Sequence, residues 1–235
     1  MSLKNFFFQS KITRKIYLYY NLYVRHKCFI NRTQYSQWGE DIIISEFFKN
    51  KDYGTYFDIG CFHPYMYSNT CLLHKKGWAG INIDINQTSI DLFKISRPKD
   101  LNLCTTINET KKKCKIYFDH PFSPVNTLDE RYFKDFKKDF FKTTSIKSVW
   151  SMTVDEILNL SGVNNIDYIN IDVEGMDYKI LNQLIPKKVK PQLISIETHS
   201  VDGSKAKDSD KIMRLLNEND FKVLKRVGPT TIFKT

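Results

Sequence analysis

From about residue 40 onward, short apolar runs alternate with segments of helical periodicity. Parallel strands need crossover connections, usually helices, so this alternation predicts βαβ units and a parallel sheet covered on both faces. The expected strands are 55–59, 81–85, 101–107, 115–118, 168–173 and 193–198, and the expected helices are 42–49, 65–76, 88–95, 153–160, 177–184 and 208–219. Segments 221–227 and 230–233 flank Gly228-Pro229 and predict a C-terminal hairpin that adds an antiparallel edge. The fold class is therefore a doubly wound, Rossmann-like α/β sheet, mostly parallel.

The composition, 41% hydrophobic and 26% charged, is typical of a globular domain and excludes a disordered or collagen-like chain. A chain of 235 residues can bury a full core without disulfides. Its five cysteines form no CxxC pair, which disfavours a zinc ribbon or a secreted disulfide framework. No apolar run reaches the roughly 18 residues of a membrane span, and no signal peptide is visible. We therefore expect a cytoplasmic protein.

Residues 1–34 differ from the domain expected at 35–235, because they are rich in aromatic and basic residues and contain no acid. This pattern predicts a helical extension. It is consistent with peripheral contact with an anionic membrane, such as the inner face of the cell membrane, or with a partner. The simpler interpretation, which we favour, is a helix that packs on the domain behind it or on the second copy of a homodimer.

Open α/β sheets bind ligands beyond the carboxyl ends of their strands. The first expected strand is followed by Gly60, which permits close backbone approach, and contains Asp58, which can bond an amine or a hydroxyl. The second contains Asp84, where an acid is placed to bind the ribose hydroxyls of an adenosine. The stretch 58–64 has one glycine instead of G-x-G-x-x-G, which disfavours NAD and favours an adenosyl ligand without phosphates, S-adenosylmethionine. A turn glycine and a capping aspartate are the simpler alternative.

Two further strand ends carry acids: Asp172 and Glu174 at one, and Glu197 with His199 at the next. Like charges at the mouth of a cleft are tolerated where a metal ion or substrate hydroxyls meet them. Oxygen and nitrogen ligands of this kind also suit a hard divalent cation. In the alternative interpretation, Asp172 and Glu174 cap the following helix and His199 is a solvated loop residue.

Methyl transfer gives this arrangement a chemical purpose. The methyl group of a sulfonium is already activated, whereas a sugar hydroxyl has a very high pKa and needs a general base or a metal ion. The candidate catalytic residues are therefore Asp172, Glu174 and His199.

Six blocks occur in order along the chain: YSQWGED at 35–41, FDIGCFHP at 57–64, YSNT at 67–70, GWAGINID at 77–84, RPKD at 97–100 and IDYINIDVEGMD at 166–177. Together they resemble the FkbM-type S-adenosylmethionine-dependent methyltransferases, over about residues 35–199. The resemblance implies a class I methyltransferase fold and O-methylation of a sugar hydroxyl on a glycan, a nucleotide-activated sugar or a glycosylated natural product.

The resemblance also implies roles for particular residues. S-adenosylmethionine would be held by Gln37, Glu40, Asp58, Gly60, Ser68, Asn69 and Asp84. Related sugar methyltransferases place Mg²⁺ near the acceptor, which makes Mg²⁺ a candidate cofactor here, with Asp172, Glu197 and His199 as candidate ligands. Phe62, His63 and Pro64 depart from the glycine-rich turn of many class I enzymes, so His63 is open between contact with a ligand and packing.

The net charge of +10 raises the alternative of a methyltransferase that acts on another acceptor, including nucleic acid, and a third alternative is a non-catalytic cofactor-binding domain. The lysines of 134–142 alternate with Phe and Asp, which favours an amphipathic lid over a phosphate track, so no nucleic-acid partner is expected. Residues 119–148 are polar and aromatic and predict a lid or insertion that selects the acceptor.

Overall fold

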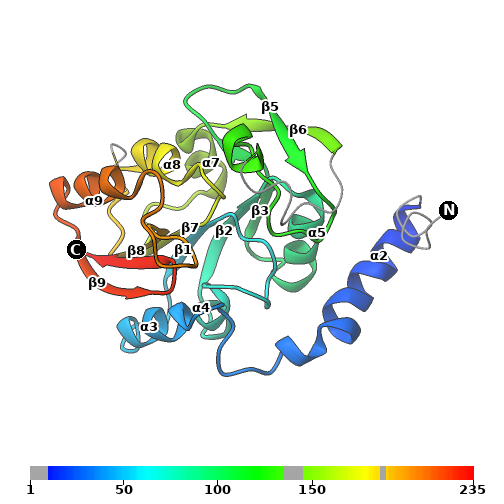
Figure 1. The fold of residues 1–235 in the computed structure, drawn as a ribbon. Helices are drawn as coiled ribbons and strands as arrows, with labels where there is room; N and C mark the ends of the chain where they lie inside the picture. Colours follow the sequence, from blue (N-terminus) through cyan, green and yellow to red (C-terminus); the bar gives the residue numbers. More distant parts are fainter. Residues whose placement is uncertain (1–9, 135–144, 186–188) are drawn as a thin grey trace.

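The computed structural model describes residues 10–134, 145–185 and 189–235, and its main sheet has the strand order β3-β2-β1-β7-β8-β10-β9 (Figure 1). The strands are β1 Thr55–Ile59, β2 Ala79–Asp84, β3 Leu101–Cys104, β7 Tyr168–Ile171, β8 Leu193–Glu197, β9 Lys222–Val227 and β10 Thr230–Lys234. The first five pair in parallel, and β10 is antiparallel to both of its neighbours. The predicted doubly wound, mostly parallel α/β fold is confirmed.

The C-terminal hairpin is also confirmed, and its strands enter the sheet in a particular order. Strand β10 lies between β8 and β9, and its Thr230 pairs with Glu197. Because β10 is antiparallel to β8 and to β9, the edge strand β9 runs in the same direction as β8. The hairpin therefore extends the sheet beyond β8 and brings the Gly228-Pro229 turn to the carboxyl ends of the parallel strands.

Helices cover both faces of the main sheet (Figure 1). They are α3 Glu40–Phe47, α4 Cys71–Lys75, α5 Gln87–Ser96, α7 Val154–Ser161, α8 Asp177–Leu184 and α9 Ser209–Glu218. Successive residues of a strand point to opposite faces. Phe57 of β1 accordingly joins the core formed with α7, α8 and α9, whereas Tyr56 packs with Ile44 of α3 and with Trp78. This burial on both faces explains why the central strands read as continuous apolar runs.

The expected helix at 65–76 is much shorter than predicted. Only Cys71–Lys75 is helical, and Tyr67 has a φ of +57°. The polar residues ahead of α4 bond to buried groups instead of continuing a helix: Ser68 accepts a hydrogen bond from Arg97, and Thr70 donates one to Asp58. Side-chain bonds of this kind compete with helical backbone bonds.

A second, three-stranded sheet lies beside the main one (Figure 1). It has the order β4-β6-β5, from Thr106–Ile107, Ser145–Met152 and Lys113–Phe118. The single strand expected at 101–107 is divided at Thr105, whose hydroxyl donates to the Trp150 carbonyl at 2.8 Å and anchors the chain to β6. Of the predicted insertion 119–148, residues 135–144 lie outside the described residues.

The N-terminal extension is helical, as expected. Helix α2, Lys11–Tyr20, continues into a π-helical turn at Asn21–Arg25 and a 3₁₀ turn at Lys27–Phe29. Leu18 and Leu22 pack on Leu92 of α5, and an ion pair of 2.5 Å joins Arg14 of α2 to Asp91. Within the described residues, no helix combines the length and the apolar character that crossing a membrane requires.

Candidate active site

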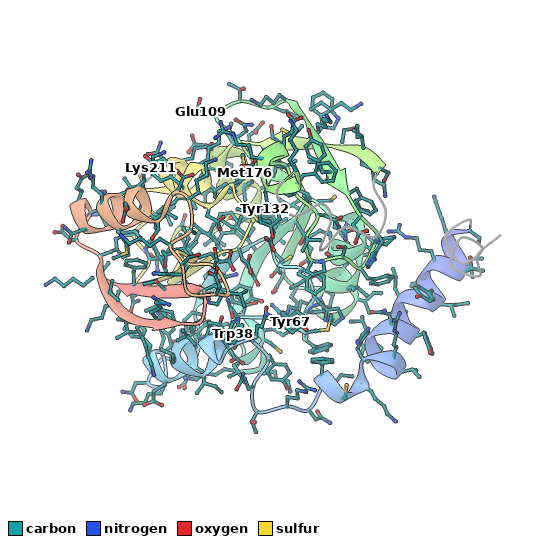
Figure 2. The ribbon with its side chains drawn as sticks, in the orientation of Figure 1. Trp38, Tyr67, Glu109, Tyr132, Met176 and Lys211 are labelled. Atoms are coloured by element: carbon teal, nitrogen blue, oxygen red, sulfur yellow. The ribbon has the colours of Figure 1, made fainter. Side chains whose placement is uncertain are left out.

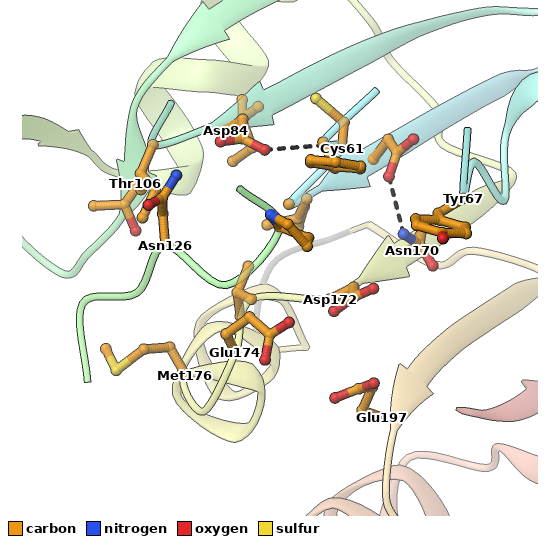
Figure 3. A pocket seen from close by; sticks show the side chains of 18 of the residues that line it. Cys61, Tyr67, Asp84, Thr106, Asn126, Asn170, Asp172, Glu174, Met176 and Glu197 are labelled. Atoms are coloured by element: carbon orange, nitrogen blue, oxygen red, sulfur yellow. Dashed lines mark hydrogen bonds between the residues drawn. The ribbon is translucent and has the colours of Figure 1, made fainter. Parts of the chain in front are cut away.

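A cavity opens where β1, β2, β7 and β8 end (Figure 3). Eight of the eleven residues selected from the sequence line it: Gln37, Asp58, Gly60, Asn69, Asp84, Asp172, Glu174 and Glu197. Three do not: Glu40, Ser68 and His199. The acidic residues predicted at the carboxyl ends of the strands therefore mostly lie together, because parallel strands end at the same edge of the sheet.

Asp58 is held by its neighbours at the end of β1. Its carboxylate accepts hydrogen bonds from the Thr70 hydroxyl at 2.6 Å and the Asn170 amide at 2.9 Å, and burial raises its pKa. Asn170 in turn accepts hydrogen bonds from Asn69 and Ser195. This buried network fixes the floor of the cavity, so Asp58 has a structural task in addition to any contact with a ligand.

Gly60 follows β1 with a φ of +84°, a conformation that favours glycine. A Cβ at this position would lie 1.7 Å from the Asp172 carbonyl oxygen. The glycine is therefore needed because the ends of β1 and β7 approach each other closely, and this approach is what brings Asp172 to the cavity.

Asp84 ends β2 and organises the loop after β1. Its two carboxylate oxygens accept hydrogen bonds from the backbone N–H of Phe62 at 2.9 Å and of Asn86 at 2.6 Å. Burial raises its pKa to about 6, although these two bonds favour the charged form. Each carboxylate oxygen has a second acceptor site, so Asp84 can still accept hydrogen bonds from ligand hydroxyls.

Asp172, Glu174 and Glu197 form the acidic cluster of the site. In Figure 3 the carboxyl groups of Asp172 and Glu197 point toward the same space, and Glu174 lies beside them. Glu174 has a φ of +52°, and its carbonyl accepts a hydrogen bond from the Thr127 hydroxyl at 2.8 Å. The insertion thus holds the Glu174 backbone in a strained conformation, which is a common feature of functional sites.

The cluster is arranged to hold protons. Burial raises the pKa of Glu174 to about 7, and a hydrogen bond from the Tyr132 hydroxyl opposes the shift. Burial and then the charge of Glu174 raise the pKa of Asp172, and burial and then the charges of Asp172 and Glu174 raise the pKa of Glu197. Near neutral pH these groups share protons, because three adjacent buried carboxylates cannot all ionise.

The alternative in which Asp172 and Glu174 cap the following helix is wrong. The N-cap residue of α8 is Met176, and no side chain caps the helix. The Asp177 carboxylate instead accepts the backbone N–H groups of Val173 and Gly175, at 3.3 and 3.2 Å, and braces the loop between β7 and α8. Asp172 and Glu174 are left to face the cavity.

The three predicted residues outside the cavity have other partners. Glu40 is buried and accepts hydrogen bonds from the Trp38 backbone N–H and the Thr230 hydroxyl. Ser68 bonds to Arg97. His199 contacts the Thr198 hydroxyl through Nδ1 at 2.8 Å, so the structure does not bring its imidazole to Asp172 or Glu197.

The predicted magnesium ligands are Asp172, Glu197 and His199, and the residues present do not fit such a site. His199 lies apart from the two carboxylates, and within the described parts of the chain no three His, Cys, Asp or Glu side chains form a group suited to a metal ion.

Sequence reasoning missed two groups that shape the site. Arg97 is fully buried, and its guanidinium donates to Tyr56, Thr70, the Pro64 carbonyl and Ser68. It supports the loop between β1 and α4. The sequence feature that could have identified it is its place in the RPKD block at 97–100, one of the six blocks shared with the family. Tyr132, labelled in Figure 2, comes from the insertion, lies beside Gly175 and bonds to Glu174, and no periodic pattern pointed to it.

The comparison with protein families agrees with this geometry. The model of the methyltransferase FkbM domain matches residues 52–223, from just before β1 into β9. The chain belongs to the FkbM methyltransferase family. A search of curated proteins finds no match.

The matched range includes every residue of the cavity lining except Gln37, which precedes it. The protein is thus a methyltransferase, and the FkbM domain includes the second sheet as well as most of the main one.

Proposed function

We propose that the protein transfers the methyl group of S-adenosylmethionine to a sugar hydroxyl of a glycan or a nucleotide-activated sugar. The observation that carries this proposal is the distribution of charge in the cavity. Its described lining includes Asp58, Asp84, Asp172, Glu174 and Glu197, but no Lys, Arg or His. A cationic sulfonium and the neutral hydroxyl groups of a sugar suit such a surface, and the diphosphate of a nucleotide-activated sugar would lie outside it.

The two ends of the cavity have different tasks in this proposal. Asp84 lies at the β2 end, where it accepts hydrogen bonds from ribose hydroxyls, and the single-glycine turn at Gly60 leaves no cradle for a pyrophosphate. The acidic cluster lies at the β7 and β8 ends, which we assign to the acceptor. S-adenosylmethionine supplies an electrophilic methyl group, so the chain has only to orient the acceptor hydroxyl and take its proton.

Glu174 is the general base in this proposal. Its pKa, raised to about 7, matches the pH at which a base works best in a cell, because it is then both available and strong enough. As the hydroxyl oxygen bonds to the methyl carbon, the hydroxyl proton passes to the Glu174 carboxylate and the electron pair of the broken C–S bond stays on sulfur. Asp172 and Glu197 accept hydrogen bonds from other acceptor hydroxyls, and Tyr132 orients Glu174.

Calorimetric titration of S-adenosylmethionine into the wild type, Asp84→Asn and Asp52→Asn tests the cofactor. The Asp84→Asn affinity should be at least about tenfold weaker, because the neutral amide is a poorer acceptor for ribose hydroxyls. Asp52 is exposed and lies outside the cavity, so Asp52→Asn should bind as the wild type does. Absence of binding by the wild type contradicts the proposal.

Turnover assays then separate the alternatives. Binding without methylation of any nucleotide sugar or glycan would favour a non-catalytic domain. Methylation of RNA or DNA instead would favour the nucleic-acid alternative, which the acidic lining of the cavity disfavours.

A further inference from the structure

A second cavity, of about 150 Å³, lies beneath the N-terminal extension. It is lined by Asn21, Arg25, His26, Phe62, His63, Met66, Ser89, Leu92, His120, Pro121 and Phe122. Phe62 also lines the candidate active site, so one side chain borders both cavities. A single ordered water needs about 10–15 Å³ on this measure, so the cavity has room for a small ligand or several waters.

Two buried polar side chains of this cavity have unmet hydrogen-bonding capacity. Asn21 is 0% exposed and His63 is 2% exposed. Within the described structure, both amide atoms of Asn21 and the Nε2 atom of His63 have no hydrogen-bond partner. A buried polar group without a partner costs about 1–3 kcal/mol, and three such atoms around one cavity indicate that something polar occupies it.

The geometry of His63 shows which kind of atom is required. Its Nδ1 accepts the backbone N–H groups of Tyr65 at 3.1 Å and Met66 at 3.0 Å, so this nitrogen carries no proton. Burial, followed by the charges of His26 and Arg97, lowers the pKa of His63 to about 3, so the ring is neutral. The proton of a neutral ring must then be on Nε2, which is a donor and needs an acceptor in the cavity.

The charged residues around this cavity differ from those in the candidate active site, where carboxylates dominate. Its described lining contains Arg25 at the exposed rim and three imidazoles, but no Asp or Glu. Ser89 lies in the first turn of the ten-residue helix α5, where the helix dipole favours negative charge. His120 lies 3.5 Å from the Asp119 carboxylate, which offsets any positive charge on its ring.

We propose that this cavity binds a phosphate group, held by His63 Nε2–H, the Asn21 amide and the Arg25 guanidinium. A protonated phosphate oxygen can also donate a hydrogen bond to Asn21 Oδ1, the third buried atom without a partner. The site goes beyond the proposed methyl transfer and does not depend on it. The phosphate belongs to a free anion, a nucleotide or a lipid headgroup, and the last is notable because Arg25 directly follows the exposed Tyr23 and Val24 of the extension.

The first test is titration with inorganic phosphate, against sodium chloride of equal ionic strength, of the wild type, Arg25→Gln, Asn21→Leu and Lys27→Gln. Phosphate should bind the wild type, and the affinity should fall at least about fivefold in Arg25→Gln and Asn21→Leu. Lys27 is exposed and outside the lining, so Lys27→Gln should stay within about twofold of the wild type. Arg25 is exposed, so its variant should fold even if Asn21→Leu does not.

Nitrogen NMR of the histidine side chains gives an independent readout. The His63 Nε2 signal should shift with added phosphate along the same binding curve. Absence of phosphate binding, equal binding by all four proteins, or a His63 signal that does not move would overturn the proposal and leave a water-filled cavity.

Displacement experiments identify the source of the phosphate once binding is shown. Competition by a nucleoside diphosphate indicates a nucleotide, and competition by phosphatidylglycerol vesicles indicates a headgroup. If neither competes, the ligand is free phosphate.

Discussion

At the scale of single residues, the acidic cluster is where stability and activity oppose each other. Asp172, Glu174 and Glu197 are carboxylates that burial and mutual repulsion hold partly protonated. Unfolding would release each of them to water and lower its pKa. Keeping these carboxyl groups buried side by side therefore lowers the free energy of unfolding above neutral pH, where they must ionise.

Replacing Glu174 by Gln should expose both effects. Wild-type kcat/KM should fall about tenfold per pH unit below pH 7, as Glu174 becomes protonated, and the variant should lose about 100-fold or more of the activity at pH 8. The folded pKa of Glu174 is above its unfolded value of 4.5, so its contribution to stability is greatest below pH 4.5 and is lost as the pH rises through about 7.

Urea unfolding at pH 8 should therefore show the Glu174→Gln variant to be more stable than the wild type, by roughly 3 kcal/mol. Glu218 is exposed on α9, and Glu218→Gln should change neither activity nor stability. A variant with full activity and a wild-type pH profile would exclude Glu174 as the base.

Gly60 offers a second test at this scale, with Gly77 as a matched control. Both glycines have positive φ, +84° and +103°. An alanine Cβ at Gly60 would lie 1.7 Å from the Asp172 carbonyl oxygen, whereas at Gly77 no heavy atom lies within 4 Å. Gly60→Ala should lower the free energy of unfolding by about 3 kcal/mol or more, and Gly77→Ala by about 1–2 kcal/mol, the cost of the backbone conformation alone. Equal losses in urea unfolding would mean that β1 and β7 are not closely apposed.

At the scale of elements, α2 is anchored on one side and uncovered on the other. Leu18 and Leu22 face α5, while Ile12, Ile16 and Val24 are 72%, 59% and 56% exposed. The same helix carries the exposed residues Lys11 and Lys15, and a basic amphipathic helix suits an anionic bilayer. Packing of one side of the extension on the domain is observed, and contact of the other side with a membrane stays a prediction.

Vesicle co-sedimentation tests the outward face. The wild type should bind phosphatidylglycerol vesicles. The double variant Ile12→Glu and Ile16→Glu should bind them at least about tenfold more weakly, because each change removes an apolar contact and adds a charge that the anionic lipids repel. Val201 is 73% exposed in a loop elsewhere, so Val201→Glu is the matched control. If the wild type ignores vesicles and the double variant converts a dimer to a monomer, the stripe is a homodimer interface instead.

At the scale of the whole molecule, the net charge of +10 does not reflect the charged residues that line the two cavities, which differ from each other. The candidate active site is lined by carboxylates, and the neighbouring cavity by an arginine and three imidazoles. The basic composition therefore describes the surface and says nothing about the acceptor of the methyl group. We expect the insertion to select that acceptor, because its Thr127 and Tyr132 already hold Glu174.

The α/β fold and most of the candidate site were predictable from the sequence because both follow from local patterns. The alternation of apolar and helical segments predicts parallel strands, and parallel strands bring their carboxyl ends together. Asp58, Asp84, Asp172, Glu174 and Glu197 were identified in this way, without knowledge of any contact.

Only the tertiary structure decided which neighbouring polar residues face the cavity and which bond elsewhere. Ser68 and Glu40 have the same polar character as Asn69 and Gln37, but buried partners, Arg97 and Thr230, hold the first pair away from the cavity. His199 lies two residues beyond Glu197 but bonds to Thr198 instead. The opening beside His63 likewise depends on how the extension packs against α5. These outcomes depend on hydrogen bonds between residues far apart in the chain, which no periodic pattern encodes.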